Sequence, residues 1–286
     1  MYTAKIQNKS GEILTLTGNE PNYQVTNIIG LDPPTAQINK SSAVGLDGAL
    51  FNSAKLEPRN IVITLKINGN IEANRRKLYK YFRTKDWCRF FYANSSVNVY
   101  IDGYVESFTC NLFSRGETAQ ISIICLYPYF RDIVENSVSA TSSIALFSFP
   151  FFINIGEPIP LSEYDTGGNV EVYNEAESET GMTIEITVNT PVSSILIRDL
   201  NSADAFTLVY PFRANDKVII NTTRGSKSIM LLRGNTTINI FSALQPGSTF
   251  FQLASGINIF SYYADGALNS SRISLIFKYN NIFRGV

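Results

Sequence analysis

Short segments in which apolar and polar residues alternate, separated by turn residues, fill the second half of this chain and most constrain its fold. Between Gly168 and Tyr279 they follow one another closely, and examples are Thr183–Val188, Val218–Asn221 and Phe250–Leu253. A period of two residues places successive side chains on opposite faces of a strand, and no helical period competes with it here. Because turns rich in Gly, Asn, Asp and Pro separate the segments, the sequence predicts an antiparallel β-sandwich.

The same alternation runs through the first half of the chain, from Lys5 to Cys125. Ile61, Ile63, Leu65 and Ile67 alternate strictly with less apolar residues, which predicts a strand with one buried face. Asp102-Gly103 lies between the alternating runs 97–101 and 104–108. Asp-Gly suits a tight turn that needs positive φ at both central residues, so the sequence predicts a hairpin turn here.

One segment, between Asn70 and Lys85, has the pattern of a helix. Asn70 is a suitable N-cap, Glu72 favours the positive end of the helix dipole, and Leu78 and Phe82 share a face that can anchor the helix on a sheet. The fold class expected for the first half is therefore α+β, and the chain as a whole is mainly β. Two interpretations stay open for the helix cations, contact with a neighbouring subunit or a solvated face; these cations are Arg75, Arg76, Lys77 and Lys80.

The chain has 286 residues, enough for two domains that each bury a core. Residues 136–143 are small and polar, which is typical of a linker or an exposed connector. We therefore expect an N-terminal domain over 1–135, a linker over 136–150 and a C-terminal sandwich over 151–286.

Catalytic chemistry finds little support in the sequence. The chain contains no histidine, which removes Ser-His-Asp and Cys-His machinery and the commonest zinc sites. Its three cysteines, Cys88, Cys110 and Cys125, are too few for a four-thiolate zinc site and form no Cys-x-x-Cys pair. The acidic group Glu171, Glu175, Glu177 and Glu179 is either a calcium site or a solvated loop. We predict that the chain is not an enzyme and has no catalytic residue, cofactor or metal.

Charge and hydropathy exclude further classes. The formal net charge is zero, so no global basic field recruits nucleic acid or anionic lipid. The first residues lack the apolar segment of a signal peptide, and no apolar run reaches the roughly 20 residues that span a bilayer. We therefore expect synthesis in a cytosol, no sequence-specific nucleic-acid binding and no membrane insertion. The many Phe and Tyr residues suit either surfaces hidden against partners or a β-rich core.

Residues 45–84 combine a glycine-hinged apolar loop, an arginine-led strand and a basic helix. In that order they resemble the N-terminal domain of the distal tail protein (Dit) family of bacteriophages. The resemblance continues through the Pro-aromatic step of Cys125 to Asp132, and through Asp216 to Thr222, Pro246-Gly247-Ser248 and Gly256-Ile257-Asn258. It covers nearly the whole chain, and the order of the motifs carries it.

The resemblance implies a structural hub of a phage tail tip or baseplate. Family members form a hexameric ring on the last ring of the tail tube, and a galectin-like C-terminal domain contacts tip or receptor-binding components. Expected partners are therefore other copies of the chain, the tail tube protein, the tail tip or tail-associated protein and a receptor-binding protein. The expected location is the virion, at the tail tip or baseplate, after synthesis in the host cytoplasm.

The candidate interface residues lie in the loop, the strand and the helix. Leu46, Leu50 and Phe51 either clasp a neighbour or fold back to bury themselves at home, and Gly45 and Gly48 hinge their loop. Arg59 is either an interface ion-pair residue or a local strand cap. The complete set of candidates is Leu46, Leu50, Phe51, Arg59, Arg75, Arg76 and Lys80.

The alternative function is a cell-wall saccharide-binding module of a phage tail or phage-tail-like bacteriocin. Galectins read sugar with a histidine, arginines and a stacking tryptophan, but this chain has no histidine and its only Trp, Trp87, lies in the other domain. Tyr262 and Tyr263 are the aromatic residues considered for stacking, and a structural role in the sandwich is the other interpretation.

Overall fold

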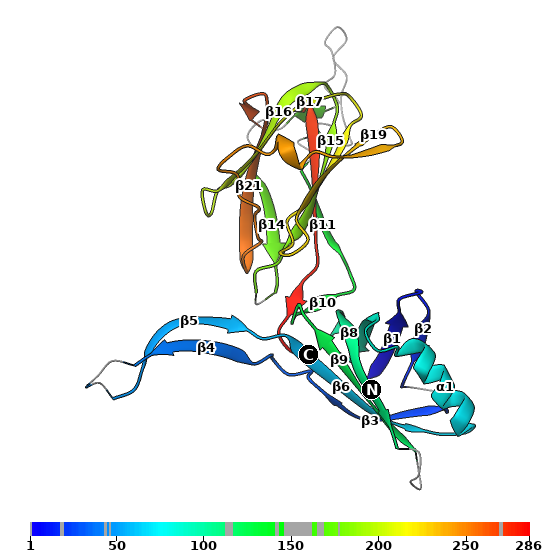
Figure 1. The fold of residues 1–286 in the computed structure, drawn as a ribbon. Coiled ribbons are helices and arrows are strands. Elements are labelled where there is room, and N and C mark those ends of the chain that lie inside the picture. Colours follow the sequence, from blue (N-terminus) through cyan, green and yellow to red (C-terminus); the bar gives the residue numbers. More distant parts are fainter. Residues whose placement is uncertain are drawn as a thin grey trace, which may run out of the picture. The chain divides into compact units, whose positions relative to one another are not determined.

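The computed structural model describes residues 2–17, 20–42, 45, 47–111, 117–140, 143–145, 162–164, 169–176, 178–268 and 271–286 (Figure 1). The described chain is mainly β, as the sequence predicts. Its contacts form two compact units, the first made of Met1–Ile133 with Ile282–Val286 and the second of Val134–Asn281. Each unit has its own apolar core.

The first unit is built on an antiparallel sheet whose strands run in the order β2-β1-β7-β8-β9-β6-β3. The bounds are β1 Thr3–Asn8, β2 Ile13–Thr15, β3 Tyr23–Ile29, β6 Arg59–Ile67, β7 Trp87–Ala93, β8 Asn98–Cys110 and β9 Thr118–Cys125. Strand β10, Phe130–Asp132, pairs with β8 and with β24, Ile282–Phe283. The predicted alternation of β6 is confirmed, because Ile61, Ile63, Leu65 and Ile67 all lie in the core.

The hairpin turn predicted at Asp102-Gly103 is wrong. Both residues lie inside the long strand β8 and pair with Arg89 and Cys88 of β7. Packing explains the glycine at position 103, because a Cβ there would lie 2.7 Å from the Ile123 side chain and 2.9 Å from Cys125 Sγ. A glycine inside a strand often marks such a close approach.

Helix α1, Ile71–Tyr81, packs on this sheet through its predicted face. The Asn70 side chain accepts a hydrogen bond from the Ala73 backbone N–H at 3.2 Å, which confirms the N-cap. Leu78 and Phe82 are buried in the core of the first unit. Phe82 caps the helix, so it ends before Arg83 and Lys85, earlier than expected.

Between β3 and β6 the described chain forms a hairpin outside the main sheet. Strand β4, Ala36–Ser41, pairs with β5, Leu50–Leu56, in a separate two-stranded sheet. Figure 1 shows this hairpin, which we call the arm, reaching out from the sheet of the first unit. Every residue of the two strands except Leu56 is exposed.

The second unit is a sandwich of two antiparallel sheets, as predicted. One has the order β11-β23-β15-β18-β19-β20 and the other β14-β21-β16-β17, with β22 beside β21. The bounds are β11 Asn136–Ala140, β14 Val170–Asn174, β15 Met182–Val188, β16 Val192–Asp199, β17 Ala205–Phe212, β18 Lys217–Asn221, β19 Ser228–Arg233, β20 Thr236–Asn239, β21 Gly256–Ala264, β22 Ala267–Leu268 and β23 Ile273–Tyr279. Two short strands, β12 Ser143–Ala145 and β13 Ser162–Tyr164, pair with each other, and the 3₁₀ helix η1 spans Phe241–Ala243. The candidate strand Phe250–Leu253 instead makes a single bridge, from Leu253 to Thr180.

The unit boundaries differ from the expected domain boundaries of 1–135, 136–150 and 151–286. Residues 136–140 of the expected linker form β11, which pairs with β23, because Val138 and Ala140 can bury apolar groups while the serines face outward. Residues Ile282–Val286 belong to the first unit, where β24 pairs with β10. Residues 141, 142 and 146–150 of that linker lie outside the described residues.

The Asp265 carboxylate bonds to two separate segments of the second unit, and its shifted pKa predicts that the stability of this unit depends on pH. Burial raises the pKa of Asp265, but hydrogen bonds from Ser193 and Ser194 and the charge of Arg272 outweigh it and lower that pKa to about 2. The Ser193 and Ser194 backbone N–H groups each donate to Asp265 Oδ1 at 2.8 Å, and Arg272 Nη1 donates to Oδ2 at 2.8 Å. The pKa of Asp265 is lower in the folded state than in the unfolded state, where it is about 4. The ionised carboxylate therefore stabilises the folded state above pH 4, and this contribution is lost as pH falls toward 2.

We therefore expect the urea midpoint of the second unit to fall between pH 4 and pH 2. Asp265→Asn should lower the midpoint at pH 6 and flatten this fall, because the amide carries no charge to lose. Glu171→Gln, at an exposed position on β14, is the matched control and should keep the fall. A fall of unchanged size in Asp265→Asn would contradict the assignment.

Candidate functional site: the arm and the outer face of the first unit

The arm is amphipathic, although its strands are exposed on both faces. Ala36 pairs with Leu56 and Ile38 with Ala54, so these four side chains share one face. The opposite face holds the polar pairs, which are Gln37 with Lys55 and Asn39 with Ser53. The described part of the first unit therefore leaves an apolar hairpin face uncovered.

The candidate interface residues of the loop lie at the far end of the arm. Leu50 and Phe51 begin β5 and are 58% and 70% exposed, so they do not fold back into the core of the first unit. Leu46 lies outside the described residues. Gly45 and Gly48 have φ of +85° and +94°, which glycine adopts without strain, and their role as hinges stays a prediction. Ile38 was missed from sequence, although the alternation of Ala36 with Ile38 and of Ala54 with Leu56 was available as a signal.

The helix cations find partners within the first unit. Arg75 and Arg76 both pair with Glu72, the latter through Nε to Oε1 at 3.0 Å. Lys80 Nζ lies 2.8 Å from Glu12 Oε1, and this hydrogen bond, supported by the charge of Glu12, raises the pKa of Lys80. Arg76 and Lys80 are solvated, whereas the Arg75 side chain is only 17% exposed. Contact of these cations with a neighbouring subunit stays a prediction, and α1 and the arm are separate elements (Figure 1).

Arg59 is not a surface residue, since it is only 3% exposed. Its Nε donates to Pro128 O at 2.9 Å, its Nη1 to Gly30 O at 2.5 Å and Asp32 O at 2.6 Å, and its Nη2 to Arg284 O. Burial lowers the pKa of the guanidinium, which carbonyl acceptors and the Phe130 ring, 4.5 Å away, surround. The interface ion-pair interpretation of Arg59 therefore fails, and a local role fits.

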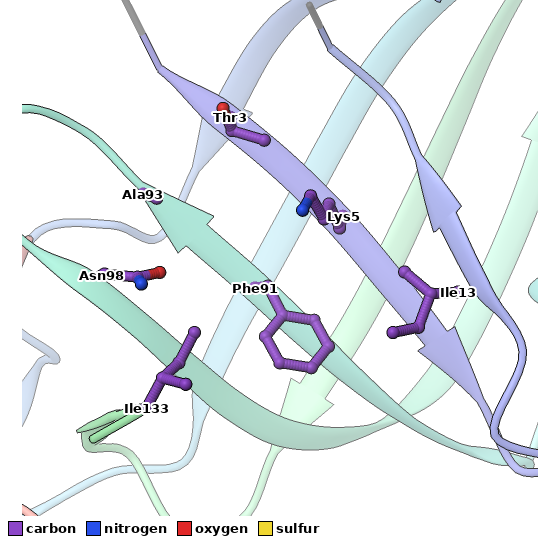
Figure 2. Close-up of a pocket in the computed structure, with 7 residues that line it drawn as sticks. All are labelled: Thr3, Lys5, Ile13, Phe91, Ala93, Asn98 and Ile133. Carbon is purple, nitrogen blue, oxygen red and sulfur yellow. The ribbon is translucent and has the colours of Figure 1, made fainter.

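A shallow groove lies on the outer face of the sheet, at the edge opposite the arm. Its volume is about 340 Å³. Figure 2 shows its lining, which comes from β1, β2, β7, the start of β8 and the residue after β10: Thr3, Lys5, Ile13, Phe91, Ala93, Asn98 and Ile133. Ile13 and Ile133 are exposed apolar side chains. Lys5 is the one titratable side chain of that lining, so the groove has no pair of groups for acid-base chemistry. It can instead serve as a contact surface.

The described residues show no arrangement suited to catalysis or metal binding. No group of three or more His, Cys, Asp or Glu residues among them could hold a metal ion. Burial raises the pKa of Cys88 and of Cys125 to about 12, so both are inert thiols. Of the acidic group, Glu179 pairs with Arg224 at 2.5 Å, Glu171 and Glu175 are exposed, and Glu177 lies outside the described residues. Tyr262 is only 2% exposed, so it cannot stack on a sugar. No helix in the described ranges is long and apolar enough to cross a membrane.

The second unit contains the part of the chain that matches a known protein family. Residues 175–280 match the family described as siphovirus-type tail component, C-terminal domain. No curated protein matches the chain in sequence.

Solved structures extend the likeness to the whole chain. The chain is similar to the SPP1 Dit (gp 19.1) protein, described as a paradigm of the hub adsorption apparatus in phages that infect Gram-positive bacteria, with 15% identity, 99% of each chain covered and a TM-score of 0.70. It is also similar to a chain of the phage P2 baseplate in its activated conformation with Ca, with 13% identity, 100% of each chain covered and a TM-score of 0.60. The resemblance to phage distal tail proteins is therefore confirmed, in sequence for residues 175–280 and in fold over the full length.

Proposed function

We propose that this chain is a structural hub of a phage tail tip or baseplate, and that its copies form a ring, six in number by the resemblance. The observation that carries the proposal is the full-length likeness to the SPP1 Dit protein, whose published description is that of a hub. The role is structural and not catalytic, and its place is the virion. The partners we propose are the tail tube protein, the tail tip or tail-associated protein and a receptor-binding protein.

The arm is the contact that we propose closes the ring. A two-stranded hairpin alone is marginally stable in water, so an amphipathic one gains most by laying its apolar face on another surface. Large exposed apolar surfaces on a folded protein commonly mark such contacts. Ile38, Leu50 and Phe51 are large apolar side chains of the arm that are 58–70% exposed.

The sheet order supports a head-to-tail contact. The arm leaves the sheet at the β6–β3 edge, whereas the groove lies at the opposite edge, on β2, β1, β7 and β8. A closed ring needs two different surfaces on each subunit, with the first of one copy meeting the second of the next. We propose that the groove receives the arm of a neighbouring copy.

The second unit is the part that we propose contacts tip and receptor-binding components, and its sandwich is galectin-like by the resemblance. The saccharide-binding alternative loses Tyr262 to the core, which leaves the half-buried Tyr263 of the pair first considered. A glycan array with the full chain separates the two functions, since a hub without lectin activity binds no glycan.

Charge substitutions on the arm and in the groove test the ring. Light scattering should give about six times the 31.8 kDa subunit mass for the wild type. We expect monomers from the arm variant Leu50→Asp with Phe51→Asp, and from the groove variant Ile13→Asp, because a charged carboxylate is costly to bury against apolar side chains. These three side chains are exposed, so each monomer should stay folded.

Mixing the two variants distinguishes a head-to-tail contact from a symmetric one. The groove variant still has an intact arm and the arm variant an intact groove, so the mixture should form dimers and no ring. Val209→Asp, at an exposed apolar position of β17 in the second unit, is the matched control and should keep the ring. A ring in either single variant, or a mixture without dimers, would overturn the proposed contact.

A further inference from the structure

Arg59 lies where four separate stretches of the first unit meet. The chain enters the arm through Gly30–Pro34 and leaves it through Leu56–Pro58, directly before Arg59 opens β6. We call these two stretches the foot of the arm. Arg59 Nη1 donates hydrogen bonds to the carbonyl oxygens of Gly30 and Asp32, so the guanidinium holds the stretch that enters the arm. The backbone of Arg59 directly follows the stretch that leaves the arm.

The other two acceptors belong to the segments that run between the units. The chain passes from the first unit to the second after Ile133 and returns at Ile282. Arg59 binds Pro128 O shortly before the first passage and Arg284 O shortly after the second. Strands β10 and β24, which pair through Phe130 with Phe283 and Arg131 with Ile282, join the two segments.

A second set of contacts joins the returning segment to the foot without passing through Arg59. The Val286 backbone N–H donates to Leu31 O at 3.1 Å. Gly285 lies so close to the foot that a Cβ there would be 2.9 Å from Pro33 Cδ and 3.3 Å from Leu31 O. The returning segment therefore braces the foot directly.

We propose that Arg59 is a coupling residue, which links the position of the arm to the two chain segments that run between the units. Its guanidinium is a rigid planar donor, so its acceptors cannot shift independently without breaking a hydrogen bond. A lysine keeps the charge but offers one nitrogen, which cannot reach acceptors on all sides. This inference concerns Arg59 alone and does not rest on the proposed ring.

Hydrogen exchange of the full chain tests the coupling. In Arg59→Lys we expect exchange to rise together in the foot, in Phe130–Asp132 and in Ile282–Val286, by about tenfold for the loss of charge-assisted hydrogen bonds. Strands β7 and β8 should stay protected. A uniform rise over the whole first unit, or a rise in only one of the three stretches, would overturn the proposal. Arg89→Lys, in the same sheet but paired with Asp102, is the matched control and should leave the foot unchanged.

A second variant leaves Arg59 in place. Gly285→Ala pushes on Pro33, and through the shared guanidinium its effect should reach Phe130–Asp132 as well as the foot. Faster exchange confined to residues beside position 285 contradicts coupling. Repeating both measurements in the arm variant Leu50→Asp with Phe51→Asp separates the two proposals, because the coupling should persist without a ring.

Discussion

Phe277→Ala should destabilise the second unit by about 3–5 kcal/mol, a large part of the 5–15 kcal/mol that typically holds a domain together. Phe277 lies on β23, fully buried, and stacks on Phe260 of β21 with ring centroids 5.1 Å apart and an interplanar angle of 19°. The two strands belong to different sheets, so this ring pair bridges the layers of the sandwich. Removing one ring leaves a cavity that the surrounding strands cannot fill without distorting both sheets.

The single tryptophan allows the two units to be followed separately. Trp87 lies on β7 of the first unit, whereas far-UV circular dichroism follows both units. In urea, Phe277→Ala should move the circular dichroism transition of the second unit and leave the Trp fluorescence transition in place. Because the arm is in the first unit, ring formation should also be kept.

The matched control is Phe241→Ala, the same substitution at a 44% exposed position of η1. It should cost clearly less, about 1–2 kcal/mol, since nearly half of this side chain stays exposed to solvent. Equal effects of the two substitutions would contradict the assigned core, and an equal shift of the Trp transition would show that the units unfold together.

The sequence predicted correctly those structural elements that depend on residues close together in the chain. The alternation around Ile63 and the cap at Asn70 act over a few residues, so they could be read directly from the sequence. Gly103 was misread because its reason lies in β9, where Ile123 and Cys125 leave no room for a Cβ. An Asp-Gly dipeptide occurs both in tight turns and in strands where a neighbour leaves no room for a side chain. The two cases can be distinguished only when the neighbouring strand is known.

The site was predictable in part, for the same reason. The glycines at the loop were recognised, but the sequence left open whether Leu50 and Phe51 are exposed. The strands β4 and β5 were missed because small and polar residues dominate them and a register shift between Asn39 and Lys40 interrupts their pairing. The role of Arg59 could not be read at all, since its acceptors lie 27 to 225 residues away in the sequence. The ion pair of Lys80 with Glu12 could not be predicted either, because the two residues are 68 positions apart in the sequence.

Gly30→Ala should cost about 3 kcal/mol or more and should also loosen the arm. Gly30 has a φ of +95°, where side chains other than glycine are strained, and a Cβ there would lie 2.2 Å from Asn60 O. Asn60 is in β6, whose hydrogen bonds to β9 resist a shift. The chain must therefore move at Gly30, whose carbonyl oxygen accepts a hydrogen bond from Arg59.

Gly11→Ala separates the clash from the backbone strain. Gly11 has a similar φ of +84° in the same unit, but a Cβ there meets nothing within 4 Å. It should cost about 1 kcal/mol, the strain of the left-handed region alone.

Trp fluorescence in urea measures the stability cost of both substitutions, and light scattering at matched concentration measures ring formation. Gly30→Ala should lose the ring under conditions that keep the monomer folded, while Gly11→Ala keeps it, because displacing the foot moves Ile38, Leu50 and Phe51 together. Equal costs for the two glycines, or an intact ring in Gly30→Ala, would show that the foot does not set the position of the arm.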